Sequence, residues 1–187
     1  MLKKLNVIAS FALVTAGGAS AALAAHHEVE DAAPHAAIIN GEGKQIGTVV
    51  FEQTPNGVLI SASIEGLAPG AHGFHLHETG VCDTATGFKS AGGHYAPRSH
   101  DHGIKEASGP HAGDMPNQFV SDDGALHAHV LNSAVTTAAG FNSLMDDDGT
   151  ALVIHAGADD YMSQPSGAAG VRLACAVISP PKDKVAE

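Results

Sequence analysis

The fold class is decided by residues 46–64, which read IGTVVFEQTPNGVLISASI. Two runs rich in Val and Ile, 46–53 and 58–64, flank the turn sequence TPNG at 54–57. An Asn-Gly pair between such runs is a strong β-hairpin signal, because both residues tolerate the positive φ angles of a tight turn. In the second run apolar and small polar residues alternate with the period of a half-buried strand. The segment therefore predicts an antiparallel hairpin.

Further short strands are expected along the chain, and no stretch shows helical periodicity. Between these strands lie two long segments, 78–116 and 156–170, crowded with Gly, Pro, Asp and His. Loops of that length inside a compact domain are usually functional or disordered, and their histidines suggest that metal ions order them. Short strands with turn signals predict an all-β antiparallel sandwich or barrel. The expected strands are Gly73–His77, Ala125–Leu131, Ala151–His155 and Val171–Ile178.

The composition excludes several classes of protein. The 187 residues suit one domain with appendages, and 44% apolar residues argue against a disordered or collagen-like chain. With 20 acidic against 9 basic residues the formal charge is −11, which argues against nucleic acid or an anionic membrane as partner. Thirteen histidines exceed the Lys and Arg together, and this excess points to metal or proton chemistry.

The amino-terminal residues have the layout of a secretory signal peptide. Lys3 and Lys4 precede an apolar run from Leu5 to Val14, and the sequence Ala-Leu-Ala at 22–24 fits a cleavage site, with 19–21 as a second candidate. A membrane anchor is less favoured, because the run is shorter than the roughly 20 residues a span needs. We expect residues 1–24 to be removed and the protein to reach the periplasm or the medium. Loss of the two lysines brings the formal charge to −13.

The mature chain is expected to hold one domain over residues 36–179. A flexible segment containing histidines, 25–35, precedes it, and a flexible tail, 180–187, follows. His26 and His27 have two interpretations that the sequence leaves open: capture of copper for delivery to the site, or a disordered tail with incidental histidines.

Two cysteines, Cys82 and Cys175, are expected to form a disulfide. In an oxidising compartment only one pairing is available to them. Free thiols are less favoured in an exported protein, and a thiolate metal site less still given the many histidines.

Some histidines have positions that suit a metal. In Gly73–His77 strand alternation puts His75 and His77 on one face, with apolar residues on the other. His155 ends another expected strand. The first long loop adds further donors, and three imidazoles with one carboxylate would form a closed tetrahedral zinc site. Four imidazoles in a flattened arrangement favour Cu(II). The loop donors are His94, His102, His111 and Asp114.

The motifs GFHLHETG at 73–80, SAGGH at 90–94, GPHAGD at 109–114 and RLAC at 172–175 resemble copper/zinc superoxide dismutase of the exported bacterial type. The resemblance covers nearly all of residues 36–179, and its most specific part is the spacing of +8, +17 and +20 after His94. It implies an eight-stranded antiparallel Greek-key β-barrel or sandwich with long metal-binding and electrostatic loops. It also implies an antioxidant oxidoreductase that converts superoxide to oxygen and hydrogen peroxide, with copper and zinc ions as cofactors.

The resemblance also implies a role for individual residues. Arg172 would attract and position the superoxide anion, and His94, shared as imidazolate by both metals, would leave copper and take a proton during turnover. Asp159 would join His75 to His102, and the Cys82–Cys175 disulfide would anchor the loop. The implied copper ligands are His75, His77, His94 and His155, and the implied zinc ligands are His94, His102, His111 and Asp114.

Two positions depart from the family pattern: Met162 lies where many members place a lysine, and Ala96 where Asn is common. Both put the rate, rather than the activity, in doubt.

Among the remaining histidines, His72 is expected to be structural, and His35 and His100 to be solvated. His127 and His129 share one strand face, and an exposed polar face is favoured over a second metal site because no third ligand is visible nearby.

Two non-enzymatic interpretations are less favoured: a periplasmic copper/zinc-binding or delivery protein on the same scaffold, and a structural β-sandwich adhesion module. Neither explains a full ligand set together with Arg172. The sequence leaves open whether the protein is a monomer or a homodimer.

Overall fold

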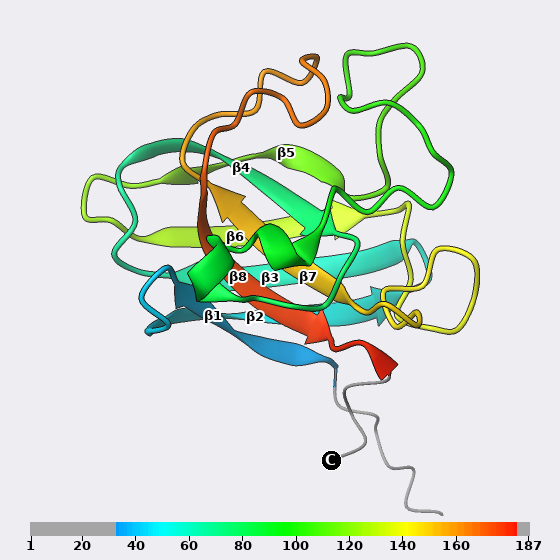
Figure 1. Ribbon diagram of the computed structural model, residues 1–187, viewed down its shortest axis with the longest axis horizontal. Helices are drawn as coiled ribbons and strands as arrows, with labels where there is room; N and C mark the ends of the chain where they lie inside the picture. The colour runs from blue at the N-terminus through cyan, green and yellow to red at the C-terminus, as the bar shows by residue number, and fades with distance from the viewer. Residues whose placement is uncertain (1–32, 183–187) are drawn as a thin grey trace, which may run out of the picture. The chain divides into compact units, whose positions relative to one another are not determined.

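Eight antiparallel strands form one sheet in the order β5-β4-β7-β8-β1-β2-β3-β6 in a computed structural model that describes residues 33–182. The expected signal peptide and nearly all of segment 25–35 lie outside the described residues. The sheet curls until β5 and β6 approach each other, which gives a nearly closed barrel (Figure 1). The strands are β1 His35–Asn40, β2 Gln45–Thr54, β3 Gly57–Ile64, β4 Gly70–His77, β5 Asp114–Val120, β6 Leu126–Asn132, β7 Thr150–His155 and β8 Arg172–Ser179.

The connections follow a Greek-key pattern, because β3 leads to β4 and β6 leads to β7, and neither pair is adjacent in the sheet. The fold class expected from the sequence is confirmed. Within residues 33–182 no helix is long and apolar enough to cross a membrane.

The hairpin expected from residues 46–64 is formed by β2 and β3. Their register runs from Gly47 opposite Ile64 to Thr54 opposite Gly57. Gly57 has φ +128°, and a Cβ there would run into the backbone of Asn132 in β6, so the turn requires glycine at this position.

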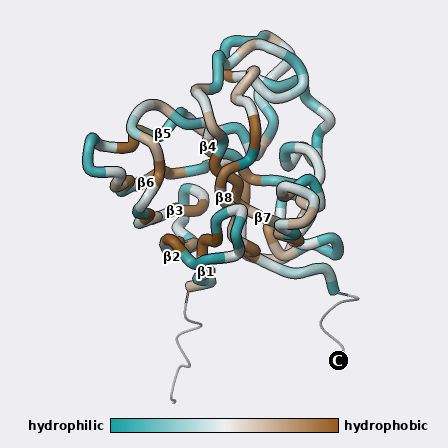
Figure 2. Tube along the Cα trace, turned by 60° about the vertical axis from the view of Figure 1, so that its left-hand side comes forward, coloured by the Kyte–Doolittle hydropathy of each residue, from teal (hydrophilic) through white to brown (hydrophobic). Residues whose placement is uncertain are grey.

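The barrel interior is filled by the apolar residues that alternate along the strands. Phe51, Ile60, Phe74, Leu126 and Leu152 are among the fully or almost fully buried side chains of one continuous core. Figure 2 shows hydrophobic residues concentrated on the strands and hydrophilic ones on the connections. The packed barrel therefore forms the scaffold from which the loops extend.

The strands expected from the sequence leave out two strands of the structure. β1 was not singled out, and β5 begins at Asp114, inside the segment expected to be a loop. β5 lies at one end of the sheet order and buries little apolar side chain besides Met115 and Val120, so its sequence carries no clear alternation. The loop before it also contains two short 3₁₀ helices, η1 Thr84–Thr86 and η2 Lys89–Ala91.

The two long loops leave the barrel between β4 and β5 and between β7 and β8. The second loop and the later part of the first project from the upper part of the view in Figure 1, whereas the segment with η1 and η2 lies in front of the strands. The expected disulfide is confirmed: Cys82, in the first loop, is bonded to Cys175 of β8. It ties the segment that carries η1 and η2 to a central strand of the sheet.

Candidate metal centre

Neighbouring strands bring three buried histidines together. His75 and His77 lie on β4, and both are completely buried. Phe74 and Leu76 point from the same strand into the core, as the alternation predicts. β7 pairs with β4 and ends at His155, which is 3% exposed. The three imidazoles are therefore held by the barrel itself.

The first long loop adds a fourth imidazole to this cluster. His94 forms an isolated antiparallel bridge with His77, which fixes the loop backbone against the end of β4. One ring nitrogen from each of the four residues lies within 4.8 Å of all the others. These converging nitrogens are buried and have no hydrogen-bond partner in the described protein: Nδ1 of His75 and Nε2 of His77, His94 and His155.

In three of these histidines the opposite ring nitrogen faces an oxygen that can only accept. That nitrogen must carry the proton, so the lone pair remains on the converging nitrogen. A cluster of buried, unpaired lone pairs is costly unless a cation occupies it. The three contacts are Nδ1 of His77 to the Gly92 carbonyl at 3.1 Å, Nδ1 of His155 to the Gly170 carbonyl at 3.3 Å, and Nε2 of His75 to Oδ2 of Asp159 at 2.8 Å.

Burial also keeps three of these imidazoles, those of His77, His94 and His155, neutral. Removal from water lowers the pKa of His155 to about 3 and that of His94 to about 4, and it holds the pKa of His77 well below the usual value. Metal ligation requires unprotonated imidazole, so the cluster is ready to bind a metal at neutral pH.

A second cluster, formed by His94, His102, His111 and Asp114, suits zinc. Nδ1 of His94 lies 2.7 Å from Oδ1 of Asp114, Nδ1 of His102 lies 3.0 Å from Oδ2, and Nδ1 of His111 lies 3.3 Å from Oδ1. One ligand atom from each of the four residues lies within 4.8 Å of all the others, which suits tetrahedral zinc, whose bonds of about 2.0–2.2 Å separate the ligand atoms by about 3.3 Å. Three nitrogens and a carboxylate are a typical closed zinc set.

The carboxylate of Asp114 is held in its charged form. Burial raises its pKa, but hydrogen bonds from His111, His94 and the Gly103 amide outweigh burial and bring the pKa well below its usual value. A charged oxygen donor is therefore available at neutral pH.

His94 belongs to both clusters. Its Nε2 is one of the converging nitrogens of the first, and its Nδ1 faces Asp114 in the second. One imidazole ring thus separates the two candidate metal positions. Protonation or a change of charge at one ring nitrogen therefore changes the electrostatic environment of the other.

Asp159 connects the clusters a second time. Its Oδ2 accepts from Nε2 of His75 at 2.8 Å, and its Oδ1 accepts from Nε2 of His102 at 3.0 Å. Burial raises the pKa of Asp159, but the bonds from His75 and His102 outweigh it and bring the value to about 2. The carboxylate orients one ring of each cluster.

Three residues that support this arrangement were not singled out from the sequence. The side-chain amide of Asn117 pairs with the backbone of Asp159: its NH₂ group donates to the carbonyl and its oxygen accepts from the N–H, at 2.8 Å each. Gln164 pairs in the same way with the backbone of His102. Gly167 has φ +68°, and a Cβ there would occupy the space of the Asp159 carboxylate. Their roles depend on contacts between distant loops, and no local motif marks them.

The first cluster opens to solvent through a cavity of about 900 Å³. We call this cavity the mouth of the first cluster. Arg172 lines it and lies opposite His155 in the register of β7 and β8. Its guanidinium donates to the carbonyls of Phe88 and Gly92, both at 2.6 Å, so its position is fixed by the loop that the disulfide anchors. Lys89 also lines the mouth, which adds a positive charge that the sequence did not reveal.

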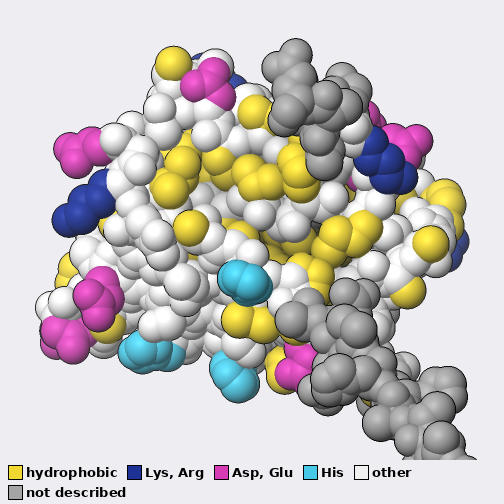
Figure 3. Space-filling view, turned by 90° about the horizontal axis from the view of Figure 1, so that it is seen from below, with side chains coloured by type: hydrophobic (Ala, Val, Ile, Leu, Met, Phe, Trp, Pro, Cys, Tyr) yellow, Lys and Arg dark blue, Asp and Glu magenta, His cyan; other side chains and the backbone are white. Residues whose placement is uncertain are grey.

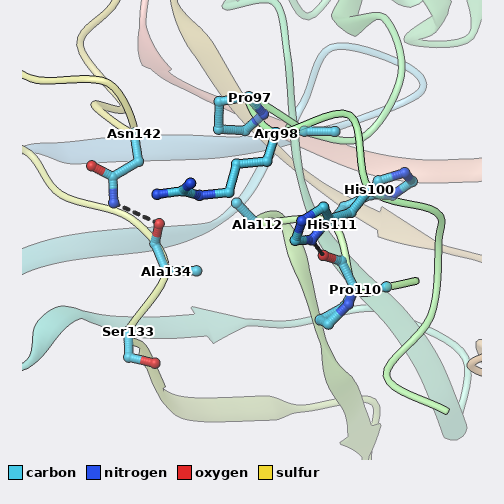
Figure 4. A pocket seen from close by; sticks show the side chains of 11 residues that line it. Pro97, Arg98, His100, Pro110, His111, Ala112, Ser133, Ala134 and Asn142 are labelled. Atoms are coloured by element: carbon cyan, nitrogen blue, oxygen red, sulfur yellow. Dashed lines mark hydrogen bonds between the residues drawn. The ribbon is translucent and has the colours of Figure 1, made fainter. Parts of the chain in front are cut away.

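A separate cavity of about 350 Å³ lies on the other side of His111 (Figure 4). Arg98 reaches across it toward Asn142, which donates to the Ala134 carbonyl at 2.7 Å. Ala96 lines this cavity and not the mouth, and Met162 lines neither. The two departures from the family pattern therefore do not line the mouth of the first cluster.

Three of the other described histidines, His35, His72 and His100, have the expected exposure. His72 is buried and contacts the carbonyls of His155 and Ala68 at 2.6 and 2.8 Å. His35, His100, His127 and His129 are exposed. His26 and His27 lie outside the described residues.

Comparison with known proteins agrees with this geometry. The family model described as copper/zinc superoxide dismutase matches residues 45–178. The chain is 50% identical over 151 residues to superoxide dismutase [Cu-Zn] 2 of Aquifex aeolicus, covering 80% of this chain and 88% of that protein. It is 42% identical to superoxide dismutase [Cu-Zn] of Caulobacter vibrioides, covering 74% and 80%. A crystal structure of a double mutant of a SOD-like protein from Bacillus subtilis superposes with a TM-score of 0.76 at 36% identity, covering 79% and 97%.

Proposed function

The chain belongs to the copper/zinc superoxide dismutase family, and on that basis we propose that its two histidine clusters are the metal sites of the enzyme. The protein is an oxidoreductase that dismutes superoxide and uses copper and zinc ions. We assign copper to His75, His77, His94 and His155, and zinc to His94, His102, His111 and Asp114. The observation that carries the copper assignment is the set of four buried ring nitrogens, one from each of its histidines, that converge without a hydrogen-bond partner in the described protein.

Each group in the mouth has a task in this reaction. Copper, when bound, supplies the one-electron chemistry by alternating between two oxidation states, and zinc is redox-inert. Arg172 binds and orients the small anion, because its guanidinium is held rigidly beside His155. His94 takes up a proton at Nε2 in one half of the cycle and passes it to the reduced product in the other. Burial lowers the pKa of His94 to about 4, which favours the release of that proton.

An assay of superoxide removal, with and without added copper, tests this assignment. We expect activity that depends on copper and is abolished in His155→Ala, whereas His35→Gln, a change at an exposed histidine remote from the clusters, keeps full activity. Copper binding without turnover would favour the copper/zinc-binding or delivery protein instead. That alternative is not favoured, because all donors and Arg172 are present in the described chain.

We also propose that the protein works outside the cytoplasm and there protects against oxidative damage. The amino-terminal pattern of residues 1–24 and the Cys82–Cys175 disulfide support this, since disulfides persist mainly in oxidising compartments. The mass of the protein from the periplasmic fraction tests cleavage after Ala24. Deletion of residues 25–34, followed by copper loading at limiting copper, tests whether His26 and His27 capture the ion.

A further inference from the structure

We propose that His127 and His129 form an additional binding site for a divalent ion of the Cu(II) or Zn(II) class on the outer surface of the barrel. Both residues lie on β6 and are exposed, whereas Ala128 between them is buried in the core. The two imidazoles therefore leave the sheet on the same side, one pleat apart, which is about 7 Å along the strand.

The same spacing occurs at the copper site that we assign above. His75 and His77 are also two residues apart on one strand, and their ring nitrogens converge to within 4.8 Å. A His-x-His pair on a strand of this barrel can thus direct two lone pairs at one point. On β6 the pair faces solvent, so an ion can reach it without any movement of the loops.

The surroundings of the β6 pair leave room for a hydrated ion. The register places Ser63 opposite His127 and Ser61 opposite His129, and both serines have small side chains. With Thr48 these residues line a shallow pocket that contains no Lys or Arg. Hydroxyl groups and water can complete the coordination sphere around two imidazoles.

One ring of the pair is already oriented. Nδ1 of His127 lies 3.2 Å from Oγ of Ser63, and this hydrogen bond orients the ring. When the hydroxyl oxygen accepts from the Nδ1 proton, the lone pair lies on Nε2, and a contact of this kind to the far nitrogen orients metal-binding histidines.

A carboxylate adds negative charge beside the pair. Asp123, in the turn before β6, has its pKa lowered chiefly by the hydroxyl of Ser121 and in smaller part by the charge of His127. It therefore lies within electrostatic reach of a cation at His127 and favours its binding.

A third exposed histidine of this face is too far away to share the ion. Across the sheet His129 faces Ser61, Ser61 faces Val50, and Val50 faces His35. Three strand spacings separate the ends of this row, about 14 Å. Figure 3 shows the exposed histidine side chains on this face of the barrel. His35 is accordingly the matched control for the pair.

The site has only two protein ligands, so it binds more weakly than either four-ligand cluster and exchanges its ion readily. This distinguishes it experimentally from the buried sites, which can be filled first.

The test uses the enzyme with its copper and zinc sites filled and with His26→Gln and His27→Gln, so that the amino-terminal histidines do not contribute. Cu(II) is then titrated by calorimetry, and the bound ion is followed by electron paramagnetic resonance. We expect one further equivalent of Cu(II) with a spectrum distinct from that of the buried copper. Loss of a group that merely orients a ligand costs 10- to 100-fold in affinity, so removal of a ligand in His127→Gln or His129→Gln should cost at least about tenfold.

His35→Gln should leave the added binding unchanged, and the double variant H127Q/H129Q should lose it while removing superoxide at the normal rate. Unchanged Cu(II) binding in the double variant, or no further equivalent in the parent enzyme, would overturn the proposal. Because the superoxide assay is read separately, failure of this site is distinguishable from failure of the proposed function.

Discussion

Oδ2 of Asp159 accepts a hydrogen bond from Nε2 of His75 over 2.8 Å, although the two residues are 84 positions apart. The other carboxylate oxygen accepts from His102, so a single side chain orients one ring in each metal cluster. Because both partners are N–H donors, only a group with two acceptor atoms fits between them.

Asp159→Asn is therefore expected to weaken both metal sites. The amide offers one acceptor, and its NH₂ group would face the N–H of the second histidine. We expect affinity to fall about 10- to 100-fold for copper and zinc alike, measured by competition with chelators. Asp160→Asn, a change at the exposed neighbouring carboxylate, is the control, and equal chelator resistance in the two variants would contradict the prediction.

Arg172→Ala should keep both metals but lower kcat/KM for superoxide by about tenfold or more, because the fixed positive charge in the mouth is lost. The dependence of the rate on ionic strength should become flatter as well. Stopped-flow kinetics at several salt concentrations measure both effects. Arg172→Lys should be intermediate, and an unchanged rate in the alanine variant would exclude the assigned role.

Lys89→Gln should lower kcat/KM by a few-fold at low ionic strength and have little effect in about 1 M salt, where charges are screened within about 3 Å. Lys44→Gln removes the same charge from the turn between β1 and β2, outside the mouth, and serves as the control. If both variants lose activity equally, net charge rather than position determines the rate.

Cys82→Ser combined with Cys175→Ser should reduce both stability and rate. The bond closes a separation of 93 residues, and its loss is expected to cost about 2–5 kcal/mol of unfolding free energy in urea titrations. The carbonyls of Phe88 and Gly92 would no longer be held firmly, so Arg172 should lose its position and kcat/KM should fall. The wild type under reducing conditions should behave alike. A stable, fully active double variant would show that the loop keeps its position without the disulfide.

Asp146→Asn should raise the melting temperature at pH 7. Burial and the neighbouring Asp148 raise the pKa of Asp146, and its Oδ1 is buried without a hydrogen-bond partner. A folded-state pKa above the unfolded one means that the ionised group destabilises the fold at neutral pH, and that this penalty disappears as the pH falls below about 3.8. Thermal unfolding at pH 7 and pH 3.5 measures the difference.

Asp147→Asn is the matched control for that prediction. The pKa of Asp147 is lowered by its hydrogen bond and charge interaction with Lys182, so its neutralisation should not stabilise the protein. A rise in melting temperature for both variants would instead point to the relief of repulsion within the acidic loop.

Much of this arrangement was predictable because it is local. The turn at 54–57, the alternation around His75 and His77, and the spacing after His94 are each contained in a short stretch of chain. What the sequence could not reveal depends on distant contacts. Asn117 supports Asp159 only because β5 lies next to the loop after β7, and Gly167 is required only because a carboxylate occupies the space in front of it.

β5 and Lys89 were missed for a different reason. An end strand with polar side chains does not show the alternation of a buried strand, so β5 resembled part of the loop. Lys89 is one charge in a segment rich in Gly, Thr and Ala, and its place in the mouth is set by the backbone of η2.

β4 carries the core residues Phe74 and Leu76 on one side and two metal-binding candidates, His75 and His77, on the other. Folding and metal loading are therefore thermodynamically coupled through one strand. An ion that binds only the folded chain adds stability in proportion to the logarithm of its free concentration over its dissociation constant. The lifetime of this enzyme should accordingly follow the supply of metal in its surroundings. A substitution deep in the barrel could then reveal itself first as a copper requirement rather than as a lower melting temperature.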